Sequence, residues 1–256
     1  MKIVFHEKYF NSSYAMDPAA APGRLEGIIE LLSNDTELEF IEPKPATKED
    51  ILRAHTERHY NYIKRDPLLL ELSLLAAGGA ILAAEEAYNN NPTFAVIRPP
   101  GHHASADSCW GFCYFNNISV SLLKLHFEGK INSAFVLDFD LHTGDGNINI
   151  LTFRNGDFRV KILNPDSSGR TGYIKEVQDY MEGLDDVDIF VASAGFDQGI
   201  EDWGHLLHPE DYFELGQLMK KYSKNLCKGR RYALLEGGYN HEVLPKNVES
   251  FCNGFK

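Results

Sequence analysis

Short apolar runs alternate with longer segments of helical periodicity along this chain. The apolar runs lie at residues 3–5, 94–97, 134–137, 160–163, 189–192 and 232–235. Most of them are apolar throughout, as expected for strands whose two sheet faces are both covered. The helical segments between them lie at residues 24–32, 48–64, 68–88, 117–127, 174–181 and 209–227. This alternation predicts an α/β fold with a central parallel sheet and helices on both faces.

The ends of the helical segments carry recognisable start and stop residues. Thr47 precedes Glu49 and Asp50, which is typical of a helix N-terminus. Gly129 and Gly229 follow helical segments at positions where glycine commonly ends a helix. Internal repeats, low-complexity tracts and charged linkers are not evident in the 256 residues, so we expect one domain over residues 1–256.

Polar or glycine-rich clusters follow four of the predicted strands directly. These clusters are Arg98–His103, Asp138–Gly146, Ala194–Asp197 and Glu236–Tyr239. The carboxyl ends of parallel strands meet at one rim of a sheet, and ligands bind beyond that rim. We therefore expect the four clusters to form a single site.

The second cluster has the composition of a metal site. Asp140 and His142 alternate along an extended chain, so both side chains are expected on the same side. The simpler interpretation is a glycine-rich turn with capping aspartates, but Asp138, Asp140 and Asp145 would repel one another without a cation. Asp197 would complete a site with open positions, as a catalytic Zn²⁺ requires, and Fe²⁺ or Co²⁺ would accept the same donors. Asp138 and Asp145 are suited to orienting imidazoles beside the metal.

The other clusters supply groups that transfer protons and bind charge. Pro99–Gly101 form a stiff turn ahead of His102 and His103. The simpler interpretation is that one of these histidines is a ligand or core residue and the other is incidental. A neutral imidazole here can take a proton from water and pass it to a leaving amine, while a second, paired with a carboxylate, can stay protonated. Tyr239 is either a surface residue of a loose turn or, on its glycine-rich segment, a hydrogen-bond donor to a developing oxyanion.

Composition limits the expected binding partners and cellular location. The net charge of −12 argues against direct binding of nucleic acid. Cys109, Cys113, Cys227 and Cys252 lack the spacing of a complete zinc knuckle, which favours buried free thiols. We expect neither a secretory segment at the N-terminus nor an apolar run long enough to span a membrane, so the expected location is the cytoplasm.

Together these motifs resemble the histone deacetylase and acetylpolyamine amidohydrolase family, and its class II and bacterial members in particular. The resemblance extends from His6 to Tyr239. It rests on the ordered segments 98–104, 110–117, 138–142, 193–197 and 236–240. It implies the arginase–deacetylase fold and hydrolysis of an acylated amine.

The resemblance also implies a role for each matching residue. Asp140, His142 and Asp197 match the family's zinc ligands. The matching catalytic residues are His103 as general base and acid, Asp145 as its orienting partner, His102 paired with Asp138, and Tyr239 as oxyanion donor. Gly111 and Phe112 match the wall of the acyl-lysine tunnel, Arg24 matches an arginine of the acetate-release cavity, and a K⁺ ion is expected near the Asp138–His142 segment.

Some positions depart from the family pattern. Thr143 stands where many members have a second histidine. The segment 164–173 lacks the usual second phenylalanine of the tunnel. Trp203 occupies the position that is acidic in polyamine-specific members, which weakens the polyamine interpretation.

The expected function is removal of an acetyl or other short acyl group from an amine such as acetyl-lysine, with no membrane or nucleic-acid partner. An acetylpolyamine or small acylamine deacetylase is the first alternative. An arginase-like ureohydrolase is less favoured, because Asp140–Asp145 misses its Asp-x-His-x-Asp spacing by one residue. A non-catalytic binder of acyl ligands would not need all of the polar residues named above. The sequence leaves the oligomeric state open.

Overall fold

Seven parallel strands form the centre of the molecule, in the order β2-β1-β3-β7-β6-β4-β5. The coordinates are a computed structural model that describes residues 1–153 and 157–256. The strands are β1 (Lys2–Val4), β2 (Glu39–Ile41), β3 (Thr93–Ala95), β4 (Ser133–Asp138), β5 (Arg159–Leu163), β6 (Ile189–Ala194) and β7 (Arg231–Leu235).

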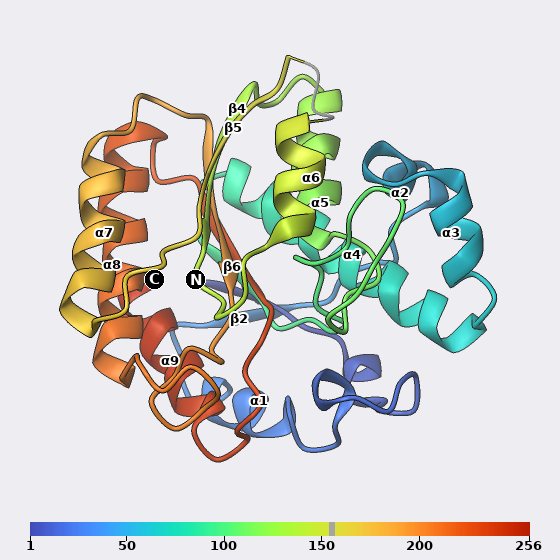
Figure 1. Ribbon diagram of the computed structural model, residues 1–256, viewed down its shortest axis with the longest axis horizontal. Coiled ribbons are helices and arrows are strands. Elements are labelled where there is room, and N and C mark those ends of the chain that lie inside the picture. The colour runs from blue at the N-terminus through green and yellow to red at the C-terminus, as the bar shows by residue number, and fades with distance from the viewer. Residues whose placement is uncertain (154–156) are drawn as a thin grey trace.

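Helices cover both faces of this sheet, as Figure 1 shows. They are α1 (Glu26–Leu32), α2 (Lys48–Ala54), α3 (Glu57–Ile63), α4 (Pro67–Tyr88), α5 (Asn117–Phe127), α6 (Asp145–Phe153), α7 (Arg170–Glu182), α8 (Pro209–Leu226) and α9 (Leu244–Phe255). One layer contains α7 and α8, with α9 packed on α8 and α1 on α9, and the other contains α4, α5 and α6. The predicted α/β class and the parallel sheet are confirmed.

The strand order brings the ends of four particular strands together. β3 pairs with β7, β7 with β6, and β6 with β4, all in parallel. In this register Asp138 lies opposite Ser193, and Ala194 lies opposite Leu235. The polar clusters that follow these strands therefore start from adjacent positions on one rim.

Several elements differ from the expectation. The edge strand β2 was not predicted, because it is exposed or half-buried and has no continuous apolar run. The helix expected over 48–64 is two helices, since the Thr56 hydroxyl accepts a hydrogen bond from the His59 N–H and starts α3. The helices α6 and α9 were also missed; α6 begins inside the glycine-rich cluster after β4.

The long helix α4 corrects the expectation about membrane spans. By length and composition, Pro67–Tyr88 is apolar enough to cross a membrane, whereas no run of that kind was expected from the sequence. Its most apolar window is 61% buried inside the molecule, where α4 packs against α5. A buried core helix of a soluble protein passes the same test, so this finding is weak support for a membrane span.

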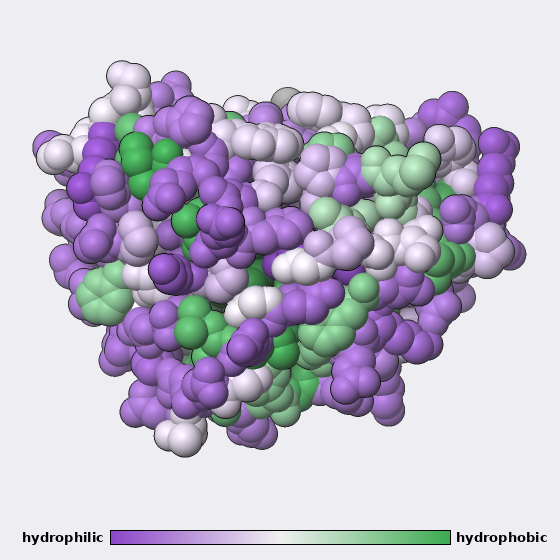
Figure 2. Space-filling view, turned by 90° about the horizontal axis from the view of Figure 1, so that it is seen from below, coloured by the Kyte–Doolittle hydropathy of each residue, from purple (hydrophilic) through white to green (hydrophobic). Residues whose placement is uncertain are grey.

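Apolar side chains and thiols are largely withdrawn from the surface. A single large cluster of buried residues includes Phe94, Phe135 and Phe190 on the sheet. All four cysteines carry free thiols, and Cys113, Cys227 and Cys252 are buried, as the favoured interpretation held. The face seen from below Figure 1 is mostly hydrophilic, with apolar side chains in separate small groups (Figure 2).

Two glycines allow α8 and α9 to approach closely. A Cβ atom at Gly216 of α8 would lie 2.4 Å from the Phe251 carbonyl oxygen of α9. A Cβ atom at Gly254 of α9 would lie 2.1 Å from the Phe213 carbonyl oxygen of α8. Backbone atoms cannot move aside as a flexible side chain does, so both positions require glycine.

We predict that Gly216→Ala lowers the free energy of unfolding by about 1–3 kcal/mol, the usual cost of overpacking a core. Gly172→Ala is the matched control, because this exposed glycine of α7 has only Ser167 near its hypothetical Cβ, at 3.6 Å. The control should be neutral or stabilising by up to about 1 kcal/mol, through helix propensity. Urea denaturation measures both, and an undiminished stability of Gly216→Ala would contradict the close helix contact.

Candidate active site

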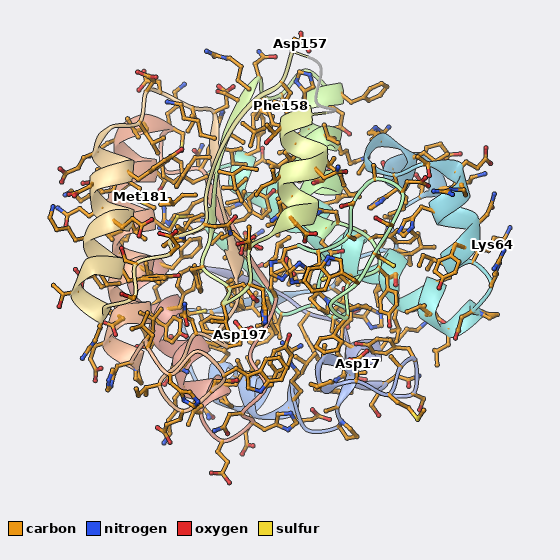
Figure 3. The ribbon with its side chains drawn as sticks, viewed as in Figure 1. Asp17, Lys64, Asp157, Phe158, Met181 and Asp197 are labelled. Carbon is orange, nitrogen blue, oxygen red and sulfur yellow. The ribbon has the colours of Figure 1, made fainter. Side chains whose placement is uncertain are left out.

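The candidate metal ligands converge just beyond the end of β4. Asp138 is the last residue of the strand, while Asp140 and His142 lie in the turn that follows. The two side chains face each other as expected. Their backbone lies beyond the strand, however, so the alternation of side chains along a strand does not explain this. His142 Nδ1 lies 3.2 Å from Asp140 Oδ1 and 3.2 Å from Asp197 Oδ2. Asp197 occupies the middle of the molecule (Figure 3).

The donor set of Asp140, His142 and Asp197 fits a divalent cation. One potential ligand atom from each residue lies within 4.8 Å of the others. Asp197 Oδ2 is buried without a hydrogen bond of acceptable geometry, whereas its Oδ1 accepts one from the Leu141 N–H at 3.0 Å. Such an orphaned carboxylate oxygen, facing an imidazole and a second carboxylate, is what an oxygen- and nitrogen-liganded metal would satisfy.

Backbone groups hold these carboxylates in place. Asp140 Oδ2 accepts a hydrogen bond from the Gly237 N–H at 2.9 Å, across 97 residues of sequence. A Cβ atom at Gly237 would lie 2.4 Å from that oxygen. Glycine after Glu236 is therefore required for the close approach of the β7 end to the candidate metal ligands.

The three groups strongly perturb one another's ionisation. Burial opposes the charge of Asp140, but His102 and the hydrogen bonds from His142 hold the pKa of Asp140 well below its usual value. Burial and the neighbouring Asp140 raise the pKa of Asp197 to about 7. Close contacts with the Asp140 and Asp197 carboxylates raise the pKa of His142 to about 10. Without a metal, protonated His142 thus offsets part of the negative charge of the cluster.

A second buried group of potential ligands, His102, Cys113 and Glu236, lies beside the first. Burial raises the pKa of Cys113 well above its usual value, which keeps it a neutral thiol, whereas a metal requires the thiolate. Glu236 Oε2 already accepts the N–H groups of Gly101 and His102, at 2.6 and 3.2 Å. We therefore assign this second group to the support of the His102 turn.

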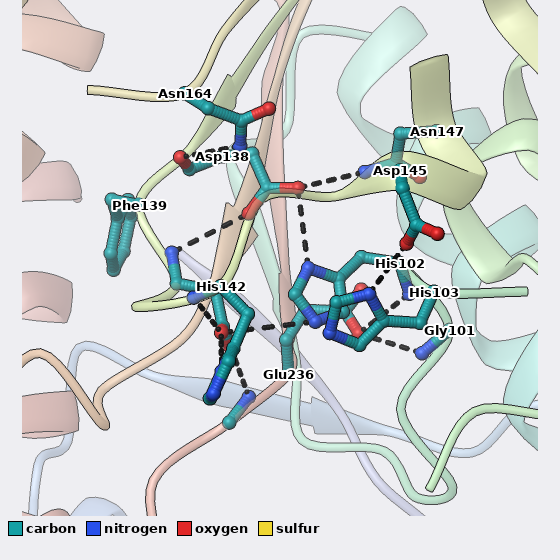
Figure 4. A network of polar contacts seen from close by, with 12 residues as sticks. Gly101, His102, His103, Asp138, Phe139, His142, Asp145, Asn147, Asn164 and Glu236 are labelled. Carbon is teal, nitrogen blue, oxygen red and sulfur yellow. Dashed lines mark hydrogen bonds and ion pairs between the residues drawn. The ribbon is translucent and has the colours of Figure 1, made fainter. Parts of the chain in front are cut away.

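Each of the paired histidines contacts its own aspartate, as Figure 4 shows. His103 Nδ1 lies 2.6 Å from Asp145 Oδ1, and His102 Nδ1 lies 3.4 Å from Asp138 Oδ2. The Asn147 amide also donates to Asp138 Oδ2, at 3.0 Å. The two imidazole rings are 4.0 Å apart between centroids, so both face one small volume.

The surroundings of the two histidines separate their protonation states. Burial and the adjacent positive charge of His102 lower the pKa of His103, which favours a neutral ring at neutral pH. Burial also opposes charge on His102, but Asp140 and Asp138 raise its pKa well above the usual value. One ring can therefore accept a proton while the other stays positive.

The remaining predicted residues border the same volume. Gly111 has φ +58°, and a Cβ atom there would lie 2.4 Å from His103 Cδ2, so this glycine lies directly against the imidazole. The rings of Phe112 and Tyr239 are 5.8 Å apart and nearly perpendicular. Burial and the nearby Asp140 raise the pKa of Tyr239, which keeps its hydroxyl protonated as a donor.

Contacts made by both tryptophans and by one buried aspartate were not predicted from the sequence. Trp110 donates its indole N–H to Asp145 Oδ2 at 2.9 Å and lies 3.8 Å from the His103 ring. Trp203 stacks on Tyr239, and Asp202 accepts hydrogen bonds from the backbone of the same segment. Trp110 begins the segment 110–117 on which the resemblance rests, but its contacts with Asp145 and His103 were not expected.

Comparison with known proteins places this site in a family. A histone deacetylase domain model matches residues 19–156, which is more than half of the chain. A "Probable deacetylase" of Archaeoglobus fulgidus is 30% identical over 95% of this chain and 82% of its own length. One of the same name from Methanothermobacter thermautotrophicus is 29% identical over 91% and 84%.

Solved structures agree with this result at the level of the fold. The HDA15 HD domain superposes with a TM-score of 0.82 over 99% of this chain and 88% of that one, at 20% sequence identity. The fold and the sequence matches define a hydrolase of the α/β class. The chain belongs to the histone deacetylase family, and it is a deacetylase of that family, as the motifs indicated.

We predict that zinc binding releases about one proton per ion at pH 7.5. His142, with a pKa of about 10, is protonated in the metal-free protein and must lose its proton to become a ligand. Zinc affinity should therefore rise about tenfold per pH unit above pH 7.5, until the pH reaches that pKa. Calorimetry in buffers of different ionisation enthalpy measures the release. Binding without proton release would contradict His142 as the ligand.

Proposed function

We propose that this chain is a zinc-dependent deacetylase that removes an acetyl or other short acyl group from acetylated lysine side chains. The observation that supports this most strongly is that two histidine–aspartate pairs lie beside the cluster of Asp140, His142 and Asp197: His102 lies 3.8 Å from Asp140, and the His103 and His142 ring centroids are 5.9 Å apart. Acetylpolyamines and other small acylamines are the second substrate class. Trp203, at a position that is acidic in polyamine-specific members, favours the first.

Asp140, His142 and Asp197 would hold the metal. Bound there, Zn²⁺ supplies a Lewis acid that lowers the pKa of a water molecule and polarises a carbonyl oxygen. Fe²⁺ or Co²⁺ would accept the same donors. A structural K⁺ ion near the Asp138–His142 segment is part of the same proposal.

His103 moves the protons. Its Nδ1 is engaged by Asp145, so Nε2 is the atom that accepts a proton from the attacking water. The same nitrogen then returns the proton to the amine as the carbon–nitrogen bond breaks. Trp110 restricts Asp145 from the other side, which fixes the orientation of the imidazole.

His102 and Tyr239 stabilise charge. A protonated His102, between Asp138 and Asp140, supplies a fixed positive charge beside the reacting atoms. The Tyr239 hydroxyl donates a hydrogen bond to the carbonyl oxygen as negative charge develops on it. Gly111 and Phe112 line the path of the substrate chain, and the products are a carboxylate and a free amine.

Two other functions fit the site less well. An arginase-like centre needs further acidic ligands near the first metal, but the Asp145 carboxylate is bound to His103 and Trp110. A pure binder of acyl ligands has no use for a neutral imidazole held by a carboxylate. The proposal also includes one catalytic domain over residues 1–256, and a cytoplasmic location, which suits the free thiols.

The direct test is turnover of three substrates by zinc-loaded protein: an acetyl-lysine peptide, an acetylated polyamine and a simple acetamide. We expect acetate release to be fastest from the peptide. If acetate is released fastest from the acetylated polyamine, the second substrate class is the correct one. If none is cleaved while zinc occupies the site fully, the deacetylase proposal is wrong.

We predict that His103→Ala lowers kcat more than His102→Ala does, with zinc retained in both variants. A residue that transfers the proton typically contributes about 10²–10⁴-fold. Metal content by atomic emission and initial rates give the comparison. Equal or reversed losses would contradict His103 as the residue that transfers the proton.

We predict that Tyr239→Phe preserves the fold and the zinc content but lowers kcat by about 10²–10³-fold, with a much smaller change in KM. The hydroxyl is needed mainly when the carbonyl oxygen becomes negative, so substrate binding depends on it little. Steady-state kinetics with the acetyl-lysine peptide check this. Turnover at the parental rate would remove Tyr239 from the oxyanion site.

A further inference from the structure

The turn that follows Asp197 reaches across to Tyr239. Within it, the Asp202 N–H donates to the Gly199 carbonyl at 2.9 Å and the Gly204 N–H donates to the Asp197 carbonyl at 2.7 Å. The turn over residues 199–204 is thus closed by its own backbone. It is tied directly to a candidate metal ligand.

Asp202 binds the backbone at Tyr239. The residue is 4% exposed, and its Oδ2 accepts hydrogen bonds from the N–H groups of Tyr239 at 2.7 Å and Asn240 at 2.8 Å. Its other oxygen accepts one from the Trp203 N–H at 2.8 Å. Three backbone N–H groups thus converge on one buried side chain, which joins the two segments.

Trp203 binds the ring of Tyr239. The two rings are stacked, with centroids 4.1 Å apart and planes inclined by 27°. Phe112 meets the tyrosine ring edge-on, and the Arg24 guanidinium lies 5.5 Å from its centroid. Trp203 itself remains 47% exposed, so one face of this stacked pair is open to solvent.

Tyr239 needs such support because the preceding backbone is unusual. Gly238 has φ +114°, a conformation open chiefly to glycine, and glycine gives a chain extra freedom. From the other side, Arg24 donates to the carbonyl oxygens of Gly238 at 2.8 Å and Glu236 at 2.5 Å. The tyrosine is therefore the end of a pliable segment that neighbouring groups hold in one place.

We propose that Asp202 and Trp203 form a clamp that positions Tyr239: Asp202 fixes its backbone and Trp203 fixes its ring. Both are positioning residues, since they act on the reaction through Tyr239. The inference rests on the proposed function, in which the tyrosine hydroxyl serves the oxyanion. One short turn then sets the place of both a metal ligand, Asp197, and the oxyanion donor.

The test is a double-mutant cycle on the zinc-loaded enzyme with the acetyl-lysine peptide. Trp203→Leu should lower kcat about 2- to 10-fold, the rate equivalent of one aromatic pair, while Trp203→Phe keeps a stacked ring and most of the activity. In the Tyr239→Phe background, Trp203→Leu should change kcat by less than about 2-fold. An undiminished effect there would overturn the clamp.

Asp202→Asn and Glu201→Gln provide a matched pair. Each removes one negative charge, but the exposed Glu201 side chain lies outside the clamp. Asp202→Asn should lower kcat more than it alters KM, and Glu201→Gln should leave both unchanged. Equal effects of the two would assign the loss to charge alone and contradict the clamp.

A measurement independent of activity uses the protein's own fluorescence. Trp110 and Trp203 are its only tryptophans, so Trp110→Phe leaves Trp203 as the single reporter. Adding Tyr239→Leu should make Trp203 more accessible to acrylamide, and unchanged quenching would show that the two rings are not stacked. Full activity of Tyr239→Phe would contradict the proposed function. If Tyr239→Phe loses activity but Trp203→Leu lowers kcat equally with and without the tyrosine hydroxyl, only the clamp is contradicted.

Discussion

Three carboxylates buried at one rim of the sheet are the constraint on which the site depends. Asp138, Asp140 and Asp197 are each at most 5% exposed. Burying ionised carboxylates so close together is costly unless each is paired with a positive charge or hydrogen-bond donors. The donors here are two imidazoles, His102 and His142, the Asn147 amide, and backbone N–H groups of the segments that follow the strands. The excess of negative charge is what prepares this rim to take up a divalent cation.

The parallel sheet brings these carboxylates together. Adjacent strands β3, β7, β6 and β4 end on the same rim, so short turns suffice to bring distant segments of sequence into contact. Asp145 illustrates how the helices contribute. It is the first residue of α6, where the partial positive charge of a helix N-terminus stabilises a carboxylate, and from there it reaches His103. One side chain thereby connects the start of α6 to His103, the proposed proton-transfer residue.

The sequence predicted those features that depend on residues close together in the chain. Apolar runs predicted the buried strands, and the polar clusters after them identified Asp140, His142, Asp197 and their neighbours as candidate site residues. It was silent on contacts between distant positions that lack a pattern. Trp110 is 35 residues from Asp145, and Asp202 is 37 residues from Tyr239, so only the folded chain reveals either pair. The position of Asp140 in a turn likewise depends on where β4 ends, which apolar periodicity defines loosely.

The most direct test of the proposed metal centre is a crystal structure of the zinc-loaded protein, with anomalous diffraction recorded on both sides of the zinc absorption edge. We expect one strong peak, about 2.0–2.2 Å from donor atoms of Asp140, His142 and Asp197. A principal peak at His102, Cys113 and Glu236 would contradict this centre. A fully occupied zinc site that Asp197 does not coordinate would also contradict it. The buried Asp197 Oδ2, which lacks a hydrogen bond, would then have no ligand to explain it.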